Sequence, residues 1–437
     1  MKRRIRNVLI LLVFSVLLGT LLLTLIFCLP VKSARENVKE SLYTMIEVKD
    51  DPAGDAQRKH IISIKENFTD ALMVQNALER VEGESMLAHA MYVYHYDLND
   101  ESYTTWQTEN SLIEFLNKGP DDLYLREYSK YWHGYLIYLK PLLMCMTWET
   151  LEVFLVIVQV LLMIAVVAAS IWKKQPLVGI GMIVALLYMK PVRIWISLAM
   201  SVCWTIVLVA ALLLILKYDR IQEKNWKEDF FLIIGIMTAY MDFLTYPIVT
   251  LGVPFCIYLV QNQEEVMGWW DRVKQAFWIC VCWAIGYVGM WGSKWVVAEV
   301  TCQTGTLRNA IWSVITRAEP LDGYGSFLSG MTRTFRTLLG QYDLKVYTIG
   351  FVLLLLATVV SVVLCLLKAR NIHWGMTVLA LCIVALFPIG WLVATQNHTA
   401  IHCWFTFRML GVSIMAIWCI MVCSIRNLRR KARENGA

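Results

Sequence analysis

Residues 176–216 read PLVGIGMIVALLYMKPVRIWISLAMSVCWTIVLVAALLLIL. As one helix this run would be roughly 60 Å long, about twice the ~30 Å hydrocarbon core of a bilayer. The interruption MKPVR at 189–193 therefore predicts a turn between two membrane-spanning helices. Similar apolar runs recur along the 437 residues, of which 58% are hydrophobic and only 17% are charged. This composition excludes an ordinary water-soluble enzyme and predicts an all-α polytopic membrane protein.

The apolar runs and the basic clusters together predict ten membrane-spanning helices. The run 229–260 would reach about 47 Å as one helix, so we expect two short spans hinged near Asp242. With ten spans, every strong basic cluster falls on one side, which the positive-inside rule makes the cytoplasm, and both termini are cytoplasmic. The predicted parts are a first transmembrane helix at 8–29, an extracytoplasmic loop at 31–145, transmembrane helices 2–7 at 149–298, a second extracytoplasmic loop at 299–345, helices 8–10 at 346–424 and a cytoplasmic tail at 425–437.

The first extracytoplasmic loop has the pattern of a folded, mainly helical unit. Apolar residues at helical spacing predict helices at 34–48 and 67–81, and a third helix around 111–116. The segment 124–144 is rich in tyrosine with interspersed Arg and Lys, which favours a helix lying at the membrane interface. The loop from Val31 to Met144 contains no cysteine, which excludes a disulfide framework there.

Polar residues at membrane depth are costly to bury and are therefore candidates for function. They gather towards the predicted outer ends of the spans: Lys190, Arg193, Asp242, Lys294, His398, His402 and Arg408. The cations suit a lipid phosphate, because Arg offers a bidentate fork and Lys a compact charge. Each position also has a structural interpretation: the long cationic side chains snorkel to the interface, and Asp242 caps a re-entrant turn.

Other candidates lie in the loops. Asp70, in the string NFTDA, is either the cap of a helix or a general base that takes a proton from an acceptor hydroxyl. His133, in the string YWHG, is expected to line the same pocket. His398 and His402 are four residues apart and share a helix face, but no third ligand completes a zinc site, so metal binding is not favoured.

Five strings carry a family resemblance. They are NFTDALM (67–73), YWHGYLIYLKPLL (131–143), YMDFLTYP (240–247), SKW (293–295) and NHTAIHCWFTFR (397–408). These strings are similar to segments of uncharacterised multi-pass membrane proteins of Gram-positive bacteria. One span, a long first outer loop and many further spans resemble the GT-C superfamily of polyprenyl-phosphate-dependent glycosyltransferases. The resemblance covers most of the chain in architecture, but only these strings in sequence.

The resemblance implies an inverting transfer of a sugar at the outer face of a bacterial cell membrane. Family members carry an acidic pair soon after the first span, whereas Asp70 is single and lies much further along the chain. We expect Asp70 to be the catalytic base, with Asp242 as the second candidate. The lipid phosphate of the donor is expected to meet Lys294, Arg408, His398, His402, His133 and Arg193.

The expected partners are a polyprenyl-phosphate-linked sugar, membrane lipid, and a glycan, lipid or protein acceptor, with no cofactor. The net charge of +6 lies in short basic clusters beside apolar runs, so it reports topology rather than nucleic-acid binding. Two alternatives stay open: an exporter of polysaccharide or lipid-linked glycan, which would line a central cavity with cations, and a glycan polymerase. A sensor or scaffold would leave the intramembrane cations unexplained.

Overall fold

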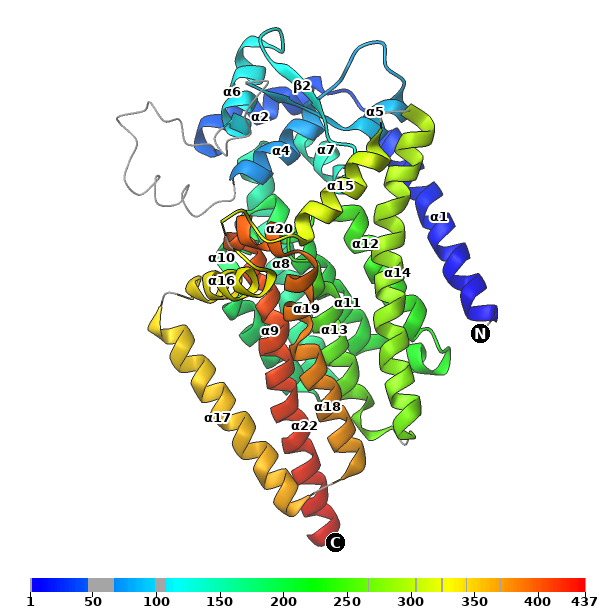
Figure 1. Cartoon of the computed structure of the whole chain (residues 1–437), viewed down its shortest axis with the longest axis vertical. Coiled ribbons are helices and arrows are strands. Elements are labelled where there is room, and N and C mark those ends of the chain that lie inside the picture. Colours follow the sequence, from blue (N-terminus) through cyan, green and yellow to red (C-terminus); the bar gives the residue numbers. More distant parts are fainter. Residues whose placement is uncertain are drawn as a thin grey trace.

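The computed structural model describes residues 2–45, 67–98, 107–265, 267–302, 305–323, 325–342, 344–369 and 371–436. A bundle of long helices carries a smaller folded unit at one end (Figure 1). We call this unit the cap, and it comprises the described residues between 32 and 145. Both ends of the chain point away from the cap (Figure 1).

Within the described chain, seven helices are long and apolar enough to cross a membrane. They are α1 (Lys2–Phe27), α8 (Trp148–Trp172), α11 (Leu198–Glu223), α14 (Trp269–Cys302), α17 (Lys345–Lys368), the pair α18 (Ile372–Ala385) and α19 (Phe387–Ala394), and the segment Cys403–Asn435, most of which is α22 (Gly411–Gly436). Three shorter helices lie in the bundle beside them: α9 (Pro176–Tyr188), α12 (Lys227–Met241) and α13 (Ile248–Gln261). At 13 to 15 residues they reach only about 20–22 Å. The protein is thus a helical, multi-pass membrane protein, and the count of ten spans stays a prediction.

Both double-length apolar runs are broken near the expected positions. The first run divides into α9, the short α10 (Pro191–Ile196) and α11. Lys190, which precedes α10, has a φ of 56°, and Pro191 begins that helix. A left-handed residue followed by proline cannot continue an α-helix, so the chain changes direction there. The second run ends α12 at Met241 and resumes as α13 at Ile248.

Helices α12 and α14 pack with their backbones in close approach. A Cβ atom added at Gly235 would lie 2.2 Å from the carbonyl oxygen of Trp283, and one at Gly286 would lie 2.2 Å from the carbonyl oxygen of Leu232. Each helix therefore presents a glycine to the other, as small residues do where membrane helices meet closely. At 34 residues, or about 51 Å, α14 is longer than a bilayer core and continues up to the cap.

The cap consists of five helices and a two-stranded sheet. Its elements are α2 (Lys32–Met45), α4 (Asn67–Leu78), α5 (Met86–Tyr92), β1 (Tyr94–Asp97), α6 (Gln107–Lys118), β2 (Tyr124–Glu127) and α7 (Leu136–Cys145). The strands pair antiparallel, with Tyr94 opposite Glu127 and Asp97 opposite Tyr124. Helices occur at the three expected places, although residues 46–48 of the first expected helix lie outside the described residues.

The prediction of an interfacial helix over 124–144 is wrong. The segment begins with strand β2, turns, and becomes helical only in α7. Three of its rings are buried: Tyr131 is 3% exposed, and Trp132 and Tyr135 are fully enclosed. Their polar tips find protein partners, since Trp132 Nε1 donates to the carbonyl of Met290 at 2.5 Å. These rings therefore fill the seam between the cap and the bundle.

Further short helices lie between the bundle and the cap (Figure 1). After α14 come α15 (Thr306–Ala318) and α16 (Phe327–Gly340), and after α19 come α20 (Gln396–Ile401), α21 (Cys403–Thr406) and the 3-10 turn η2 (Phe407–Leu410). A second 3-10 turn, η1 (Asn262–Glu264), lies at the opposite end, after α13. The residues expected at the outer ends of the spans are thus mostly carried by short elements rather than by the long helices.

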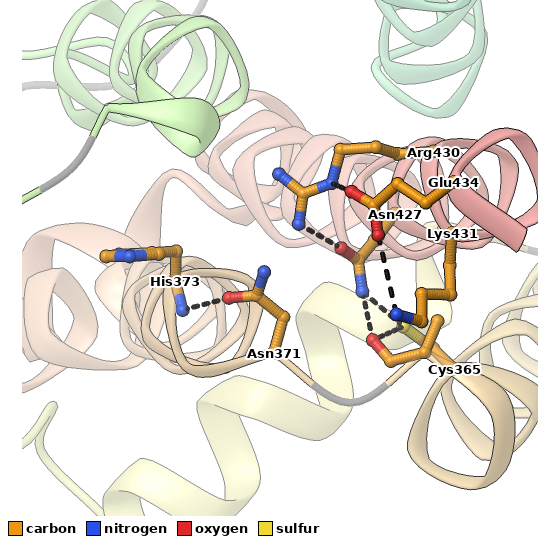
Figure 2. Close-up of polar contacts among 8 residues, drawn as sticks. Cys365, Asn371, His373, Asn427, Arg430, Lys431 and Glu434 are labelled. Carbon is orange, nitrogen blue, oxygen red and sulfur yellow. Dashed lines mark hydrogen bonds and ion pairs between the residues drawn. The ribbon is translucent and has the colours of Figure 1, made fainter. Parts of the chain in front are cut away.

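Helix α17 leans out from the bundle and is fastened at both ends (Figure 1). At its C-terminal end, Asn427 of α22 donates to the carbonyl of Ala369 at 2.5 Å and to Cys365 Sγ at 3.1 Å (Figure 2). Arg430 donates in turn to Asn427 Oδ1 at 3.1 Å and fixes the orientation of that amide. At its N-terminal end, the carbonyl of Tyr347 accepts a hydrogen bond from α9.

Candidate functional site

Asp70 lies in the first turn of α4 and is buried. Its Oδ1 accepts hydrogen bonds from the hydroxyl of Ser197 at 3.0 Å and from the backbone N–H of Ala199 at 2.9 Å. Its Oδ2 accepts from the N–H of Leu198 at 2.9 Å. The first N–H groups of a helix have no partner within it, so this carboxylate caps α11 from another part of the chain. The capping role expected at Asp70 is present, but the helix it caps is α11.

Asp242 lies at the break between α12 and α13 and is buried. Its Oδ2 accepts from the backbone N–H of Thr245 at 2.9 Å, and its Oδ1 accepts from the Thr245 hydroxyl. These bonds close a tight turn in which Leu244 has a φ of 71°. The thiol of Cys203 in α11 and the backbone of Leu244 also interact with this carboxylate.

The turn after Asp242 reaches three other parts of the protein. The ring of Phe243 contacts Tyr131 of the cap, with centroids 5.7 Å apart. The carbonyl of Leu244 lies 2.8 Å from Nε2 of His398 in α20. The hydroxyl of Tyr246 donates to the carbonyl of Met200 in α11. The break therefore places a carboxylate where cap, bundle and α20 meet.

We define the cap junction as Tyr131, Asp242, Arg317, His398 and His402. Arg317 of α15 donates to the hydroxyl of Tyr131 at 2.8 Å and lies over the rings of Tyr131 and Trp291. Burial raises the pKa of Tyr131, Arg317 lowers it, and Asp242 raises it further. The Tyr131 hydroxyl is thus within electrostatic reach of one guanidinium and one carboxylate.

The two histidines of the cap junction pack against each other, with ring centroids 4.7 Å apart. Burial and the nearby Arg317 lower the pKa of His402 to about 4. Burial, with His402 and Arg317, lowers the pKa of His398 well below its usual range. Both rings are therefore neutral near pH 7, and Nε2–H of His398 donates to Leu244. At that pH neither histidine carries a positive charge that could pair with a lipid phosphate. Arg317 is a cation that lowers the pKa of both histidines.

His133 lies in the cap beside the cap junction, with its ring centroid 5.2 Å from that of Phe243 and 6.3 Å from that of Tyr131. Its Nε2 lies 2.8 Å from the carbonyl of Tyr128, and its Nδ1 lies 3.0 Å from the hydroxyl of Tyr135. That hydroxyl donates to Asn76 Oδ1 at 3.0 Å. His133 therefore connects the turn before α7 to helix α4 and positions the neighbouring aromatic rings.

Lys294 and Arg408 lie in different surroundings. Lys294 is fully buried in α14, where its Nζ donates to the carbonyl of Ala90 at 2.9 Å and lies over the ring of Trp132. Arg408 is buried in η2 and donates to the carbonyl oxygens of Trp404 and Phe405 at 3.1 and 3.3 Å. Lys294 therefore holds the cap, whereas Arg408 holds the turn that precedes it in the chain.

Arg193 and Lys190 form a second candidate site at the cap end of α9. They line a cavity of about 620 Å³ between α9, α10 and the start of α17. Among the residues that the structure describes, the lining includes both cations and the rings of Tyr188 and Tyr347. Lys190 lies over the rings of Tyr347 and Phe407, at 5.8 and 5.9 Å. This is a cationic cavity bordered by aromatic and aliphatic side chains.

In the part of the chain that the structure describes, no three His, Cys, Asp or Glu side chains lie close enough together to bind a metal ion. His398 and His402 do lie together, as their spacing predicted. Arg317 was missed, because nothing in the sequence around it distinguishes it from other surface arginines of the second loop.

The chain matches no protein-family model, and neither a curated protein nor a solved structure shows significant similarity to it.

Proposed function

We propose that this protein transfers a sugar from a polyprenyl-phosphate donor to an extracytoplasmic acceptor, with the reaction at the cap junction. The observation that carries the proposal is the buried Asp242 carboxylate at the break between α12 and α13, where the next residue, Phe243, packs against Tyr131, whose hydroxyl accepts from Arg317. A base and a fixed cation at the cap end of a membrane bundle are what such a transfer needs. The partial resemblance to GT-C enzymes supports the class of reaction only.

Asp242 and Arg317 together supply the proton acceptor and the positive charge that the transfer requires. The Asp242 carboxylate takes the proton of an acceptor hydroxyl, and the acceptor oxygen attacks the anomeric carbon of the donor sugar. The bond between that carbon and the phosphate oxygen breaks, and its electron pair leaves on the polyprenyl phosphate. Arg317 stabilises the charge that gathers on the leaving phosphate, so no second carboxylate is needed.

Asp242 is preferred over Asp70 as the base. All three hydrogen bonds described for Asp70 run to Ser197 and to the start of α11, and so commit its oxygens to holding the cap against the bundle. The contacts of Asp242 stay within the bundle: it accepts hydrogen bonds from Thr245 of its own turn, and Leu244 and Cys203 also interact with its carboxylate. A base must also lie near the groups that bind substrate, and the turn that carries Asp242 contacts Tyr131, the hydrogen-bond partner of Arg317.

The test is reconstitution of the purified protein with polyprenyl-phosphate sugars and candidate acceptors. Asp242→Asn is expected to lower the release of polyprenyl phosphate about 100-fold or more, as loss of a general base does. Asp271→Asn is the matched control, because Asp271 is 69% exposed at the far end of α14. Full activity in Asp242→Asn would remove the assignment.

The same vesicles separate transfer from the exporter alternative. An exporter moves an intact lipid-linked glycan across the bilayer and breaks no bond to phosphate. Translocation of an uncleaved glycan lipid, with no release of polyprenyl phosphate, would therefore replace the proposal by export. A glycan polymerase would instead lengthen the lipid-linked glycan itself.

A further inference from the structure

Helix α15 crosses the cap end of the bundle at an angle to α14, and one of its faces is bonded to the cap (Figure 1). Positions 306, 313 and 317 are seven and four residues apart, so they lie on one side of the helix. Each makes a hydrogen bond to one of three consecutive cap residues: Thr306 donates to Ser129 Oγ at 2.9 Å, Ser313 Oγ accepts from Lys130 at 2.8 Å, and Arg317 donates to the hydroxyl of Tyr131 at 2.8 Å. The cap is thus held along most of the length of α15.

The same cap segment is also held from α14. The backbone carbonyl of Lys130 accepts hydrogen bonds from the indole N–H groups of Trp291 and Trp295, at 2.9 and 3.0 Å. Residues 129–131 therefore lie between α14 and α15. Because Arg317 is part of α15, the position of this helix decides how the guanidinium meets Tyr131.

A second side of α15 carries exposed apolar residues, which we call the apolar stripe. It consists of Leu307, Ile311, Val314 and Ile315, whose spacing of four, three and one places them on one side of the helix. These side chains are between 37% and 49% exposed, and Trp312 beside them is 67% exposed. Removing a large aliphatic side chain fully from water is worth about 1.5–3 kcal/mol, so the apolar stripe favours an apolar cover.

The membrane is the apolar phase at this place in the fold. Helix α15 contacts α14 and α19, which both belong to segments long and apolar enough to cross a membrane. Exposed apolar side chains continue into the last turns of α14, where Val296 is 52% and Val300 is 75% exposed. Such side chains face lipid in a multi-pass membrane protein, so lipid extends to the end of α14 at which α15 follows. A helix with one apolar side lies in the plane of the membrane interface, with tryptophan at the level of the headgroups.

We propose that α15 is an interfacial helix whose apolar stripe binds the lipid leaflet on the cap side of the membrane, and that this contact holds Arg317 on Tyr131. The partner is a lipid surface, with hydrocarbon against the apolar stripe and headgroups beside Trp312. The surface does not depend on the reaction. Only the consequence for sugar transfer, through Arg317, rests on the proposed function.

The first experiment identifies what covers the apolar stripe. The full chain in phosphatidylcholine nanodiscs carries the photo-crosslinking residue p-benzoylphenylalanine at Ile311, at Ile315 or at Asn309. Asn309 is the matched control, because it is exposed and lies two residues from Ile311, on the opposite side of the helix. Lipid adducts, detected by mass spectrometry, are expected at Ile311 and Ile315 with about five times the yield at Asn309 or more. Equal yields at the three positions, or crosslinks to a second copy of the chain in place of lipid, would overturn the proposal.

The second experiment tests whether the lipid contact holds the helix. Ile311→Asp with Ile315→Asp puts two charges into the apolar stripe, which lipid excludes, so the amides of α15 should exchange hydrogen about tenfold faster in nanodiscs. Asn309→Asp adds a charge on the opposite side and should leave exchange unchanged. Ile311→Ala with Ile315→Ala is a milder pair that serves if the charged pair does not fold, and it should give an intermediate rate. Unchanged exchange in the charged pair, or in the alanine pair where the charged pair does not fold, would overturn the proposal.

The cap segment reports the coupling to Arg317. In the charged pair the peptide that contains Tyr131 should also exchange faster, because α15 no longer holds it. Faster exchange in α15 alone would overturn the coupling. Neither experiment needs substrate, so lipid adducts at Ile311 and Ile315 uphold the surface even when no sugar transfer is detected. If Asp242→Asn abolishes transfer while the charged pair transfers sugar normally, the proposed function holds and the coupling fails.

Discussion

The carboxylate of Asp70 accepts a hydrogen bond from the hydroxyl of Ser197 at 3.0 Å, across 127 residues of chain. Ser197 is itself the N-cap of α11, and its hydroxyl also accepts from the backbone N–H of Met200 at 3.2 Å. One aspartate of the cap thus completes the capping of a bundle helix and fastens the two parts together. Away from water, buried polar groups must find their hydrogen-bond partners within the protein. Contacts of this kind therefore fix the position of the cap relative to the bundle.

Replacing Asp70 is expected to weaken the fold. Asp70→Ala leaves two backbone N–H groups and a hydroxyl buried without this acceptor, at a cost of about 2–4 kcal/mol in the free energy of unfolding. Asp70→Asn keeps one acceptor oxygen and should cost less. Thermal unfolding in detergent measures both, with the exposed Asp121→Ala as control. An Asp70→Asn protein of unchanged stability but without activity would instead make Asp70 the base.

The crossing of α12 and α14 provides a paired test of packing. Gly286→Ala is expected to destabilise the protein by about 1–3 kcal/mol, because the new Cβ meets backbone atoms of α12 that no rotamer change can move. Gly292→Ala lies on the same helix with nothing within 4 Å, so it should be neutral or slightly stabilising. Equal melting temperatures for the two variants would contradict the close approach.

Acid should destabilise the cap junction through His402. Its pKa in the folded protein is about 4, below the value near 6.5 of an unfolded histidine, because of burial and Arg317. Between these values the unfolded chain binds a proton that the folded chain does not. The contribution of neutral His402 to the free energy of unfolding is therefore complete above pH 6.5. It falls by up to about 3 kcal/mol as the pH decreases towards 4.

The His402→Gln variant isolates this contribution. It should unfold with a shallower dependence on pH between 6.5 and 4 than the wild type, while Arg317→Gln should raise the pKa of His402 and reduce the slope in part. Melting temperatures across that pH range provide the measurement. An unchanged slope in His402→Gln would mean that other groups carry the acid sensitivity.

Lys294 is expected to serve the fold rather than the lipid phosphate. Its buried ammonium donates to the carbonyl of Ala90 and lies against Trp132. Lys294→Met keeps the length of the side chain and removes the cost of burying a charge, which offsets the lost hydrogen bond, so stability should change by less than about 2 kcal/mol. Polyprenyl phosphate binding should be unchanged. A tenfold loss of binding would return Lys294 to the ligand site.

The candidate site was predictable only in part. Asp242 and the His398–His402 pair stand out in the sequence, because polar side chains inside apolar runs are rare and a spacing of four puts two residues on one helix face. The contact of Arg317 with Tyr131 has no such signal, since it joins residues 186 positions apart. Strands β1 and β2 have four residues each, too few to show an alternating pattern.

The sequence by itself determined what depends on the length and order of apolar runs: a helical membrane protein, breaks near Lys190 and Asp242, and a folded first loop. These features follow from bilayer thickness and from local backbone chemistry, which act on neighbouring residues. The tertiary structure decided which polar groups meet. It placed Asp70 on the start of α11, Lys294 under the cap and Arg193 in a cavity beside α17, because partners of buried polar groups are chosen by packing between distant segments, and no local pattern records that choice.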